Sequence, residues 1–373
     1  MHSGVRQFIH WLEAHREDEG ISLESPASSR DLNSIEEQIG EPLPDDLRLV
    51  LARFNGGQLP SGQLLPAGAG PGTIEAAVRE VAEHFDTDFL DPELLLPFHR
   101  TVEGSLLAFD RSAGPVSDTW PIVDFSEDTG EVRLIHRTFD GWCGKCVADW
   151  TAPDFEAEFT VDTYLATGLR HVQAEPDVAS AHAIVAHAQR RAGRPYEAIQ
   201  SYLRAARCTP ALPWCDWEAL KLAVILDLPA EAMEALIRLS AKAPQSRWAR
   251  RETTPSRVAE VLGQMAIRQE PEERAAWLRI LDLLSAQAEE GEKDVIRAVR
   301  AAVSEGSPLP APRPSHEQSV VPAQADLDSY WAAVRQAYID GSLRDDDMLF
   351  DPSLAVLRQH RPFAKILQIR REF

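Results

Sequence analysis

The sequence has few cysteines, no long apolar run and few basic residues in its first half. Its four cysteines among 373 residues are too few for a disulfide framework and are typical of a reducing compartment. No stretch approaches the ~20 consecutive apolar residues that a membrane helix needs. Residues 1–18 also lack the apolar run and small-residue cleavage site of a signal peptide. We therefore expect a cytoplasmic protein that does not enter a membrane.

Motifs of common catalytic sites are also missing. The segment GAGPG at residues 68–72 lacks the Gly-Lys-Ser/Thr of a nucleotide-binding loop and the spacing of a dinucleotide fingerprint. Ser105 and Ser126 lack the surroundings of a nucleophile elbow, and no H-E-x-x-H zinc-protease motif occurs. The sequence therefore predicts no enzyme activity and no cofactor.

A single C-x-x-C pair is formed by Cys143 and Cys146. A zinc knuckle needs a second such pair, and the spacing of Cys208 and Cys215 does not provide one. A redox pair would lie at the strand-to-helix junction of a thioredoxin-like unit, which the surrounding pattern does not predict. We expect no metal site at these cysteines.

Acidic charge is concentrated in the first part of the chain. The net charge is −21, and residues 1–170 hold 31 acidic against 12 basic side chains, whereas the remainder holds 28 against 26. Such a surface repels nucleic acid and anionic membranes and attracts basic proteins. The alternative is that the charge only keeps the protein in solution.

Residues 35–57 have the pattern of two short helices followed by a tight turn. Gly40 can adopt the left-handed conformation that ends a helix, and Pro44 favours the start of the next one. Leu47, Val50, Leu51 and Phe54 then recur at helical spacing, and Asn55-Gly56-Gly57 ends the run.

This order of residues resembles the SUKH superfamily, which includes bacterial toxin-immunity proteins and Smi/Knr-type fungal cell-wall regulators. The residues that carry the resemblance are Glu36, Ile39, Gly40, Leu43, Pro44, Phe54, Asn55, Gly56 and Gly57. It implies an α+β domain over residues 1–169, with helices packed on a small antiparallel sheet. It also implies a protein partner.

Strand-like segments follow this motif and support the same fold class. Residues 95–99, 105–110, 121–126 and 131–139 alternate as strands do, and turn-forming residues separate them, which predicts an antiparallel meander. Residues 154–169 return to a helical pattern. We expect its buried positions to be Phe155, Phe159, Tyr164 and Leu165.

Residues 178–304 read as helical repeats of the tetratricopeptide type, which form an all-α solenoid. The small, aromatic and terminating positions are Gly193, Ala198, Tyr202, Ala205 and Pro210. A shift of about 34 residues gives Ala232, Leu236, Leu239 and Pro244. In a third, weaker copy over 255–289, Pro255 and Pro271 can begin helices, and Ala275, Ala276, Ile280 and Leu283 are expected to face inward.

The last part of the chain divides into a linker and a helical end. Residues 305–325 are proline-rich and have no periodicity, which predicts a linker. Residues 326–373 regain helical patterning, and we expect them to cap the solenoid.

These observations favour a non-catalytic protein-binding function. The leading hypothesis is an immunity protein that neutralises a basic toxin domain by direct binding, and the alternative is a scaffold that assembles partners on its helical repeats. Candidate partner-binding residues combine aromatic anchors with acidic charge on or beside the predicted sheet. They are Trp120, Asp124, Glu127, Asp128 and Trp142. For both tryptophans, packing in the core is the alternative.

Overall fold

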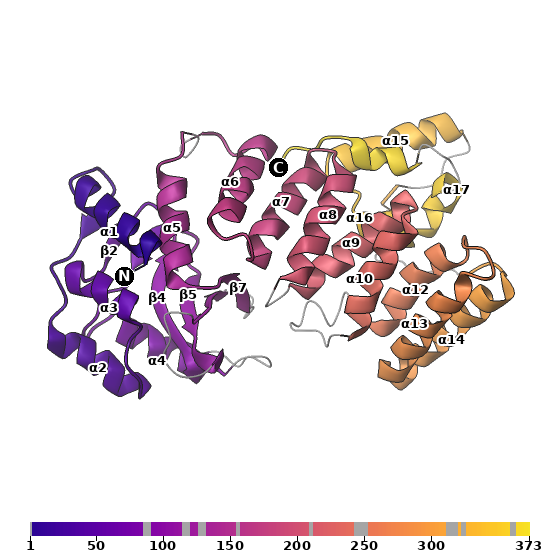
Figure 1. The fold of residues 1–373 in the computed structure, drawn as a ribbon. Coiled ribbons are helices and arrows are strands. Elements are labelled where there is room, and N and C mark those ends of the chain that lie inside the picture. Colours follow the sequence, from indigo (N-terminus) through magenta and orange to yellow (C-terminus); the bar gives the residue numbers. More distant parts are fainter. Residues whose placement is uncertain are drawn as a thin grey trace. The chain divides into compact units, whose positions relative to one another are not determined.

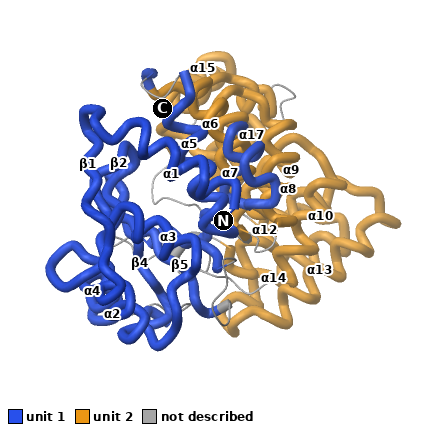
Figure 2. The backbone as a smooth tube through the Cα atoms, turned by 60° about the vertical axis from the view of Figure 1, so that its left-hand side comes forward, with its two compact units in different colours: residues 1–158, 169–181 blue, residues 159–168, 182–373 orange. Residues whose placement is uncertain are grey.

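The computed structural model divides the chain into two compact units. It describes residues 2–84, 91–113, 120–125, 132–153, 157–208, 212–241, 253–310, 320–321, 326–358 and 363–373. Unit 1 comprises Met1–Glu158 and Leu169–Ala181, and unit 2 comprises Phe159–Gly168 and His182–Phe373 (Figure 2). The chain passes between the units at three points, after residues 158, 168 and 181.

Unit 1 is an α+β domain built on an antiparallel sheet (Figure 1). Its α-helices are α1 (Ser3–His15), α2 (Ser29–Ile39), α3 (Asp45–Arg53), α4 (Ile74–His84) and α5 (Phe139–Trp150), with 3-10 turns η1 (Pro92–Leu94) and η2 (Arg111–Ala113). Its strands are β1 (Ser22–Leu23), β2 (Gly57–Leu59), β3 (Gly62–Leu64), β4 (Leu95–Thr101), β5 (Leu106–Asp110), β6 (Ile122–Phe125) and β7 (Val132–His136).

The seven strands lie in chain order, and each pairs antiparallel with the next. The predicted meander and the predicted fold class are therefore confirmed. The sequence reading missed β1, β2 and β3, because strands of two or three residues with glycines at their ends show no measurable alternation.

Two predicted boundaries are wrong. Phe139 begins a helix, α5, because the Thr138 side chain caps it by accepting a hydrogen bond from the Gly141 backbone N–H at 3.0 Å. The helix expected from residue 154 begins at Val161, where α6 (Val161–Ala174) starts. Phe159 lies before it and is 62 % exposed, so its predicted burial is also wrong.

The remaining predicted positions of that helix are not core residues. Tyr164 and Leu165 are only partly buried, and Phe155 lies outside the described residues.

The motif at residues 35–57 forms the predicted helix pair. Gly40 takes the left-handed conformation with φ 73° after α2, and Pro44 is the N-cap of α3. The apolar faces of both helices are buried with the sheet in one core. Their buried members are Leu32, Ile35, Leu47, Val50 and Leu51.

Unit 2 is all helical in its described residues, as predicted. Its helices are the first part of α6, most of α7 (Ala179–Arg191), then α8 (Pro195–Arg207), α9 (Pro213–Leu226), α10 (Pro229–Ala241), α12 (Pro255–Ala266), α13 (Arg274–Gln287), α14 (Glu290–Glu305), α15 (Leu327–Ile339), α16 (Asp345–Phe350) and α17 (Ala355–Arg358). Short 3-10 turns are η3 (Pro352–Leu354) and η4 (Phe363–Gln368).

The first two helical hairpins of unit 2 share a turn geometry. Between α7 and α8, Gly193 has φ 72°, and between α9 and α10, Asp227 has φ 60°. Positions 193 and 227 lie 34 apart, as do the first helical residues Pro195 and Pro229. This spacing is the one that the sequence predicts, while the assignment to the tetratricopeptide class stays a prediction.

The third predicted copy has the wrong register. Ala275 and Ala276 are exposed, and Leu283 is 50 % exposed. Ile280 is buried as predicted, and the other buried residues are Trp277, Leu281 and Leu284. The error arises because Pro271 does not begin the helix, which starts at Arg274.

Candidate functional site

The two tryptophans proposed as partner anchors lie in the core of unit 1. Trp120 is 1 % and Trp142 is 2 % exposed. The Trp142 ring lies 5.0 Å from that of Phe98 on β4 and 5.4 Å from that of Phe8 on α1, centroid to centroid. Both side chains therefore contribute to stability, and the proposal that they anchor a partner is corrected.

The sheet itself explains this correction. Five consecutive residues of β4, Leu95 to His99, are buried, and successive side chains of a strand point to opposite faces. The centre of the sheet is therefore covered on both faces. Asp124 on β6 is partly buried, and Glu127 and Asp128 lie outside the described residues.

The polar residues of the motif hold the helix pair in place. Glu36 Oε1 accepts hydrogen bonds from the Leu43 backbone N–H at 3.0 Å and from Arg48 Nη1 at 2.5 Å. The Asn55 side-chain amide donates to the Ala67 carbonyl at 3.0 Å, and its oxygen accepts from the Ala67 N–H at 2.7 Å. Glu36 thus joins α2 to the start of α3, and Asn55 fixes the loop after β3.

The two motif glycines are needed for close backbone approach. Gly57 has φ 133°, and a Cβ there would lie 1.9 Å from the carbonyl oxygen of Ser22. Gly56 has φ 87°, and its Cβ would lie 2.7 Å from the backbone nitrogen of Pro66. Any side chain at Gly57 would therefore separate β1 from β2.

A buried arginine, Arg111, lies at the end of α2 beside Glu41 and Asp91. Arg111 Nη1 donates to the carbonyl of Ile39 at 2.9 Å and lies 3.9 Å from Glu41 Oε1, and Nη2 donates to the carbonyl of Glu93. Burial lowers the pKa of Arg111, and Glu41 and Asp91 partly offset this. We define the acidic edge as Glu37, Glu41, Asp91 and Glu93.

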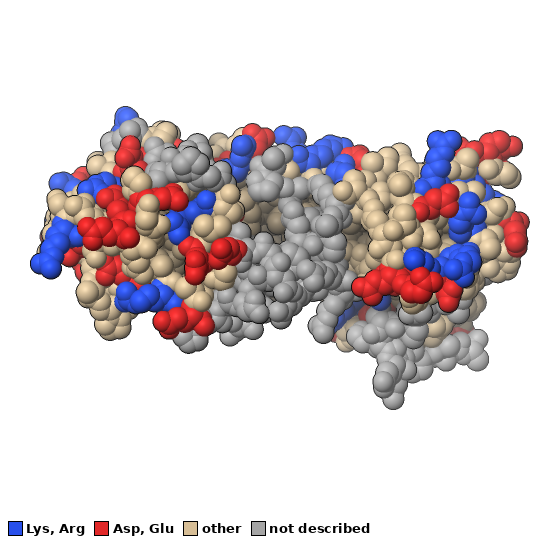
Figure 3. Space-filling view, turned by 90° about the horizontal axis from the view of Figure 1, so that it is seen from below, with Lys and Arg blue, Asp and Glu red and all other residues tan. Residues whose placement is uncertain are grey.

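The charge of this edge is accessible to a partner. Glu37, Asp91 and Glu93 are exposed, and Glu41 is partly exposed. Arg111 is the cation at the centre of the edge, and it is only 7 % exposed. The face of unit 1 that carries α2 and α4 presents several patches of Asp and Glu interspersed with a few basic side chains (Figure 3). The edge therefore projects net negative charge.

Unit 1 also contains two buried histidine–carboxylate pairs that sequence reasoning missed. His136 Nδ1 on β7 lies 2.5 Å from Glu175 Oε2, and His171 Nε2 on α6 lies 2.8 Å from Asp149 Oδ2 on α5. Burial lowers the pKa of His136 to about 4, although the hydrogen bond to Glu175 raises it. Burial likewise lowers the pKa of His171, against the effect of Asp149.

These pairs join α6 and the residue after it to β7 and to α5. A neutral His136 must donate its Nδ1 proton to the Glu175 carboxylate, which leaves Nε2 as an acceptor, and among the described residues that buried nitrogen has no hydrogen-bond partner. Both imidazoles are inaccessible, at 4 % and 7 % exposed. No sequence motif marks such pairs, because their members come from β7, α5 and α6.

The C-x-x-C cysteines lie within α5, where both are buried. Burial raises the pKa of Cys146 to about 12 and raises that of Cys143 well above its usual value. Both thiols are therefore protonated and poor nucleophiles at neutral pH.

Two other kinds of site are absent from the described residues. Among those residues, no three His, Cys, Asp or Glu side chains are grouped so as to hold a metal ion. None of the helices that the structure describes is long and apolar enough to cross a membrane.

The fold defines a class: a domain of helices on an antiparallel sheet, followed by an all-helical unit. Residues 26–145 match the SMI1 / KNR4 family (SUKH-1), so the resemblance seen in the motif is confirmed over α2 to the first half of α5. No curated protein matches the chain. The family match supports a protein-interaction or immunity-type role.

Proposed function

We propose that this protein is a SUKH-type immunity protein that neutralises a toxin by direct binding, without catalysis. The observation that carries the proposal is the family match over residues 26–145. The acidic edge adds a chemical reason, because a toxin that cleaves nucleic acid needs a basic cleft for phosphates, and a carboxylate-rich surface complements such a cleft.

The arrangement of the edge suits a charged partner. Glu37, Asp91 and Glu93 are exposed, so a partner can contact them without a rearrangement of the domain, and Asp91 also caps η1 by accepting from the Glu93 backbone N–H at 3.0 Å. Arg111 is held by backbone carbonyls of α2 and η1, which fixes the spacing of the acidic side chains around it. A pre-formed acidic surface speeds association with a basic protein.

The proposal assigns no reaction to the chain. The two histidine–carboxylate pairs are buried, so a substrate would have to open α5 and α6 to reach them. Burial also keeps Cys143 and Cys146 as thiols. The cytoplasm is the expected location, because the thiols need a reducing compartment.

Co-expression tests this function. Each toxin domain encoded beside the gene is expressed in a sensitive host, alone and with the full chain, and survival is counted. We expect the full chain to restore growth against one toxin and to form a complex with it at equal stoichiometry in gel filtration. Direct neutralisation is contradicted if the full chain protects the host against none of these toxins, or if it protects the host without forming a complex.

A further inference from the structure

The C-terminal tail of unit 2, residues 326–373, inserts two aspartates among three cations from different helices. Asp345 Oδ2 accepts from Arg190 Nε on α7 at 3.1 Å. Asp346 accepts from Lys221 Nζ on α9 at 2.6 Å and from Arg257 Nη2 on α12 at 3.1 Å. The tail therefore contacts α7, α9 and α12, and its assignment as a cap on the solenoid stays a prediction. We name these three cations the cationic seat.

The seat is shielded from solvent. The side chains of Arg190 and Lys221 are 5 % and 7 % exposed, and those of Asp345 and Asp346 are 12 % and 17 % exposed. Burial raises the pKa of Asp345, but the charge of Arg190 outweighs this, so the pKa lies below its usual value. Lys221 also pairs with Glu218 of α9 at 2.8 Å, so removing the two tail carboxylates would leave Arg190 and Arg257 without these partners while Lys221 kept one.

Asp347 follows the two aspartates and caps α16 by accepting a hydrogen bond from the Arg344 backbone N–H at 2.9 Å, and apolar residues then complete the insertion. Met348, Leu349 and Phe350 are at most 1 % exposed. The guanidinium of Arg257 lies 4.1 Å from the ring centroid of Phe350, and Gln264 Nε2 on α12 donates to the Leu349 carbonyl at 3.1 Å. The recognised pattern is thus a pair of carboxylates that contact the seat, one helix-capping aspartate, and an apolar turn.

The end of the tail binds through its backbone. The Arg371 N–H donates to the Arg191 carbonyl at 2.8 Å, and Arg191 Nη1 donates to the Glu372 carbonyl at 2.5 Å. Gly193 makes room for this segment, because a Cβ there would lie 2.4 Å from the carbonyl oxygen of Gln368. The tail therefore contacts the helices as an extended ligand does.

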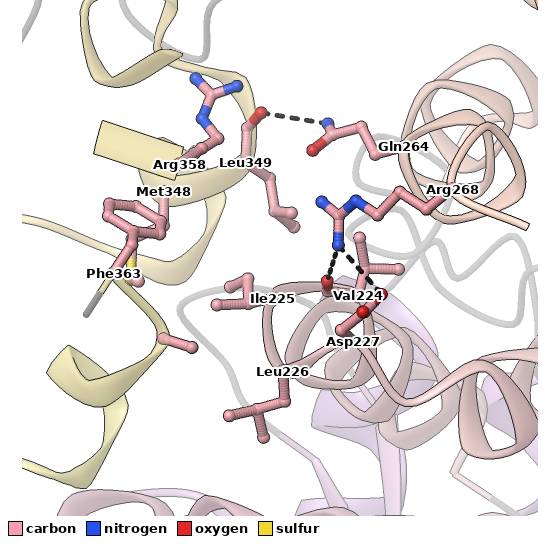
Figure 4. A pocket seen from close by; sticks show the side chains of 11 residues that line it. Val224, Ile225, Leu226, Asp227, Gln264, Arg268, Met348, Leu349, Arg358 and Phe363 are labelled. Atoms are coloured by element: carbon pink, nitrogen blue, oxygen red, sulfur yellow. Dashed lines mark hydrogen bonds and ion pairs between the residues drawn. The ribbon is translucent and has the colours of Figure 1, made fainter. Parts of the chain in front are cut away.

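The junction between tail and helices is incompletely packed. A cavity of about 390 Å³ lies between α9, α12 and the tail (Figure 4). Its lining includes Ile225 and Leu226 of α9, Arg268 of α12, and Met348 and Phe363 of the tail. The pocket opens to solvent, so the tail leaves part of the groove beside α9 and α12 uncovered.

We propose that the cationic seat is a binding site for an acidic–apolar segment of another protein, which displaces the tail that occupies it. The ligand would present two adjacent carboxylates to Arg190, Lys221 and Arg257, followed by apolar residues in the places of Met348, Leu349 and Phe350. This site is independent of the acidic edge. If the protein acts as a scaffold through this seat, the tail must first leave it, because the docked tail covers Arg190, Lys221 and Arg257.

A full-chain variant tests the seat. The probe is a fluorescent peptide with the sequence of residues 342–358, and Asp345→Asn with Asp346→Asn weakens the resident tail. We expect the double variant to bind the peptide at least about tenfold more tightly than the wild type. Asp328→Asn with Asp340→Asn is the matched control, because both aspartates are exposed in the tail, and it should behave as the wild type. Adding Lys221→Met to the double variant should abolish binding.

Hydrogen exchange of the wild type gives a second test that needs no variant. We expect the amides of residues 363–373 to exchange faster than those of α9, and excess peptide to increase the difference. If these amides exchange only together with α9, the tail is part of the fold and the proposal fails. Equal peptide binding by double variant and control also overturns it. A dimer of the double variant that takes up no peptide overturns it too, because a second copy is then the occupant.

Discussion

At the scale of the residue, glycine positions in the motif differ in what they tolerate. Gly40 and Gly57 both have positive φ, but a Cβ at Gly40 meets nothing within 4 Å, whereas one at Gly57 meets the Ser22 carbonyl oxygen at 1.9 Å. Alanine at Gly40 therefore lowers the stability of the fold only through its unfavourable backbone conformation. At Gly57 a steric clash adds to that loss.

We predict different losses of stability for these two positions. Gly40→Ala should lower the free energy of unfolding by about 1 kcal/mol, and Gly57→Ala by more than about 3 kcal/mol, because the β1–β2 pair must separate. Urea unfolding of the full chain measures both. Equal losses would show that β1 does not approach Gly57 as described.

Thiol labelling tests the burial of the cysteines. Cys143, Cys146 and Cys215 are buried, and Cys208 is partly exposed. Burial raises the pKa of the three buried thiols. A thiol-specific reagent at neutral pH should therefore label Cys208 alone in the native protein, and all four residues in denaturant. Peptide mass mapping identifies the sites, and rapid native labelling of Cys143 or Cys146 would reopen a redox role.

At the scale of the element, two strands carry histidines that are buried in the neutral state. Burial lowers the pKa of His99 on β4 and of His136 on β7 to about 4. In the unfolded chain these imidazoles titrate near 6.5. Below that pH the unfolded state binds protons that the folded state does not, so stability falls as pH falls toward 4.

We predict that β4 and β7 open more easily in mild acid. The free energy of opening, obtained from hydrogen exchange of their amides and corrected for intrinsic rates, should decrease between about pH 7 and pH 4.5. His136→Gln should reduce the slope, because it removes one of the titrating groups. An opening free energy that is constant over this range would contradict the neutral burial of both histidines.

Elements with a clear period were predictable, and short or capped ones were not. The strands β4 to β7 are four or more residues long, rich in apolar residues and separated by turn-forming residues, so they stand out in the sequence. In contrast, α5 depends on the Thr138 cap, and the register of α13 depends on its start at Arg274 and not at Pro271. Local pattern does not fix such starts.

The same distinction applies to the candidate sites. The motif at residues 35–57 is local in sequence, so its glycines and its family could be recognised. Burial of Trp142 depends on α1, α5 and β4 together, and aromatic residues serve cores and interfaces alike. The acidic edge and the cationic seat are assembled from segments far apart in the chain, which no spacing rule connects.

At the scale of the whole molecule, the two units differ in charge. The excess of acidic residues lies in residues 1–170, while residues 171–373 are nearly balanced. Within unit 2, the three cations of the seat are neutralised by the chain's own tail. The acidic edge therefore suits a basic partner, and the cationic seat suits an acidic segment.

The central claim is that negative charge on the acidic edge binds the toxin. The decisive measurement is the dissociation constant of the toxin that the full chain neutralises, at low and at high salt. One variant carries Glu37→Gln, Asp91→Asn and Glu93→Gln. Its matched control carries Glu17→Gln, Asp18→Asn and Glu19→Gln, which neutralise three exposed acidic residues after α1.

The account predicts that the edge variant loses at least about tenfold in affinity at low salt, that the loss shrinks at high salt, and that the control stays near wild type. Equal affinities for the edge variant, the control and the wild type would contradict it.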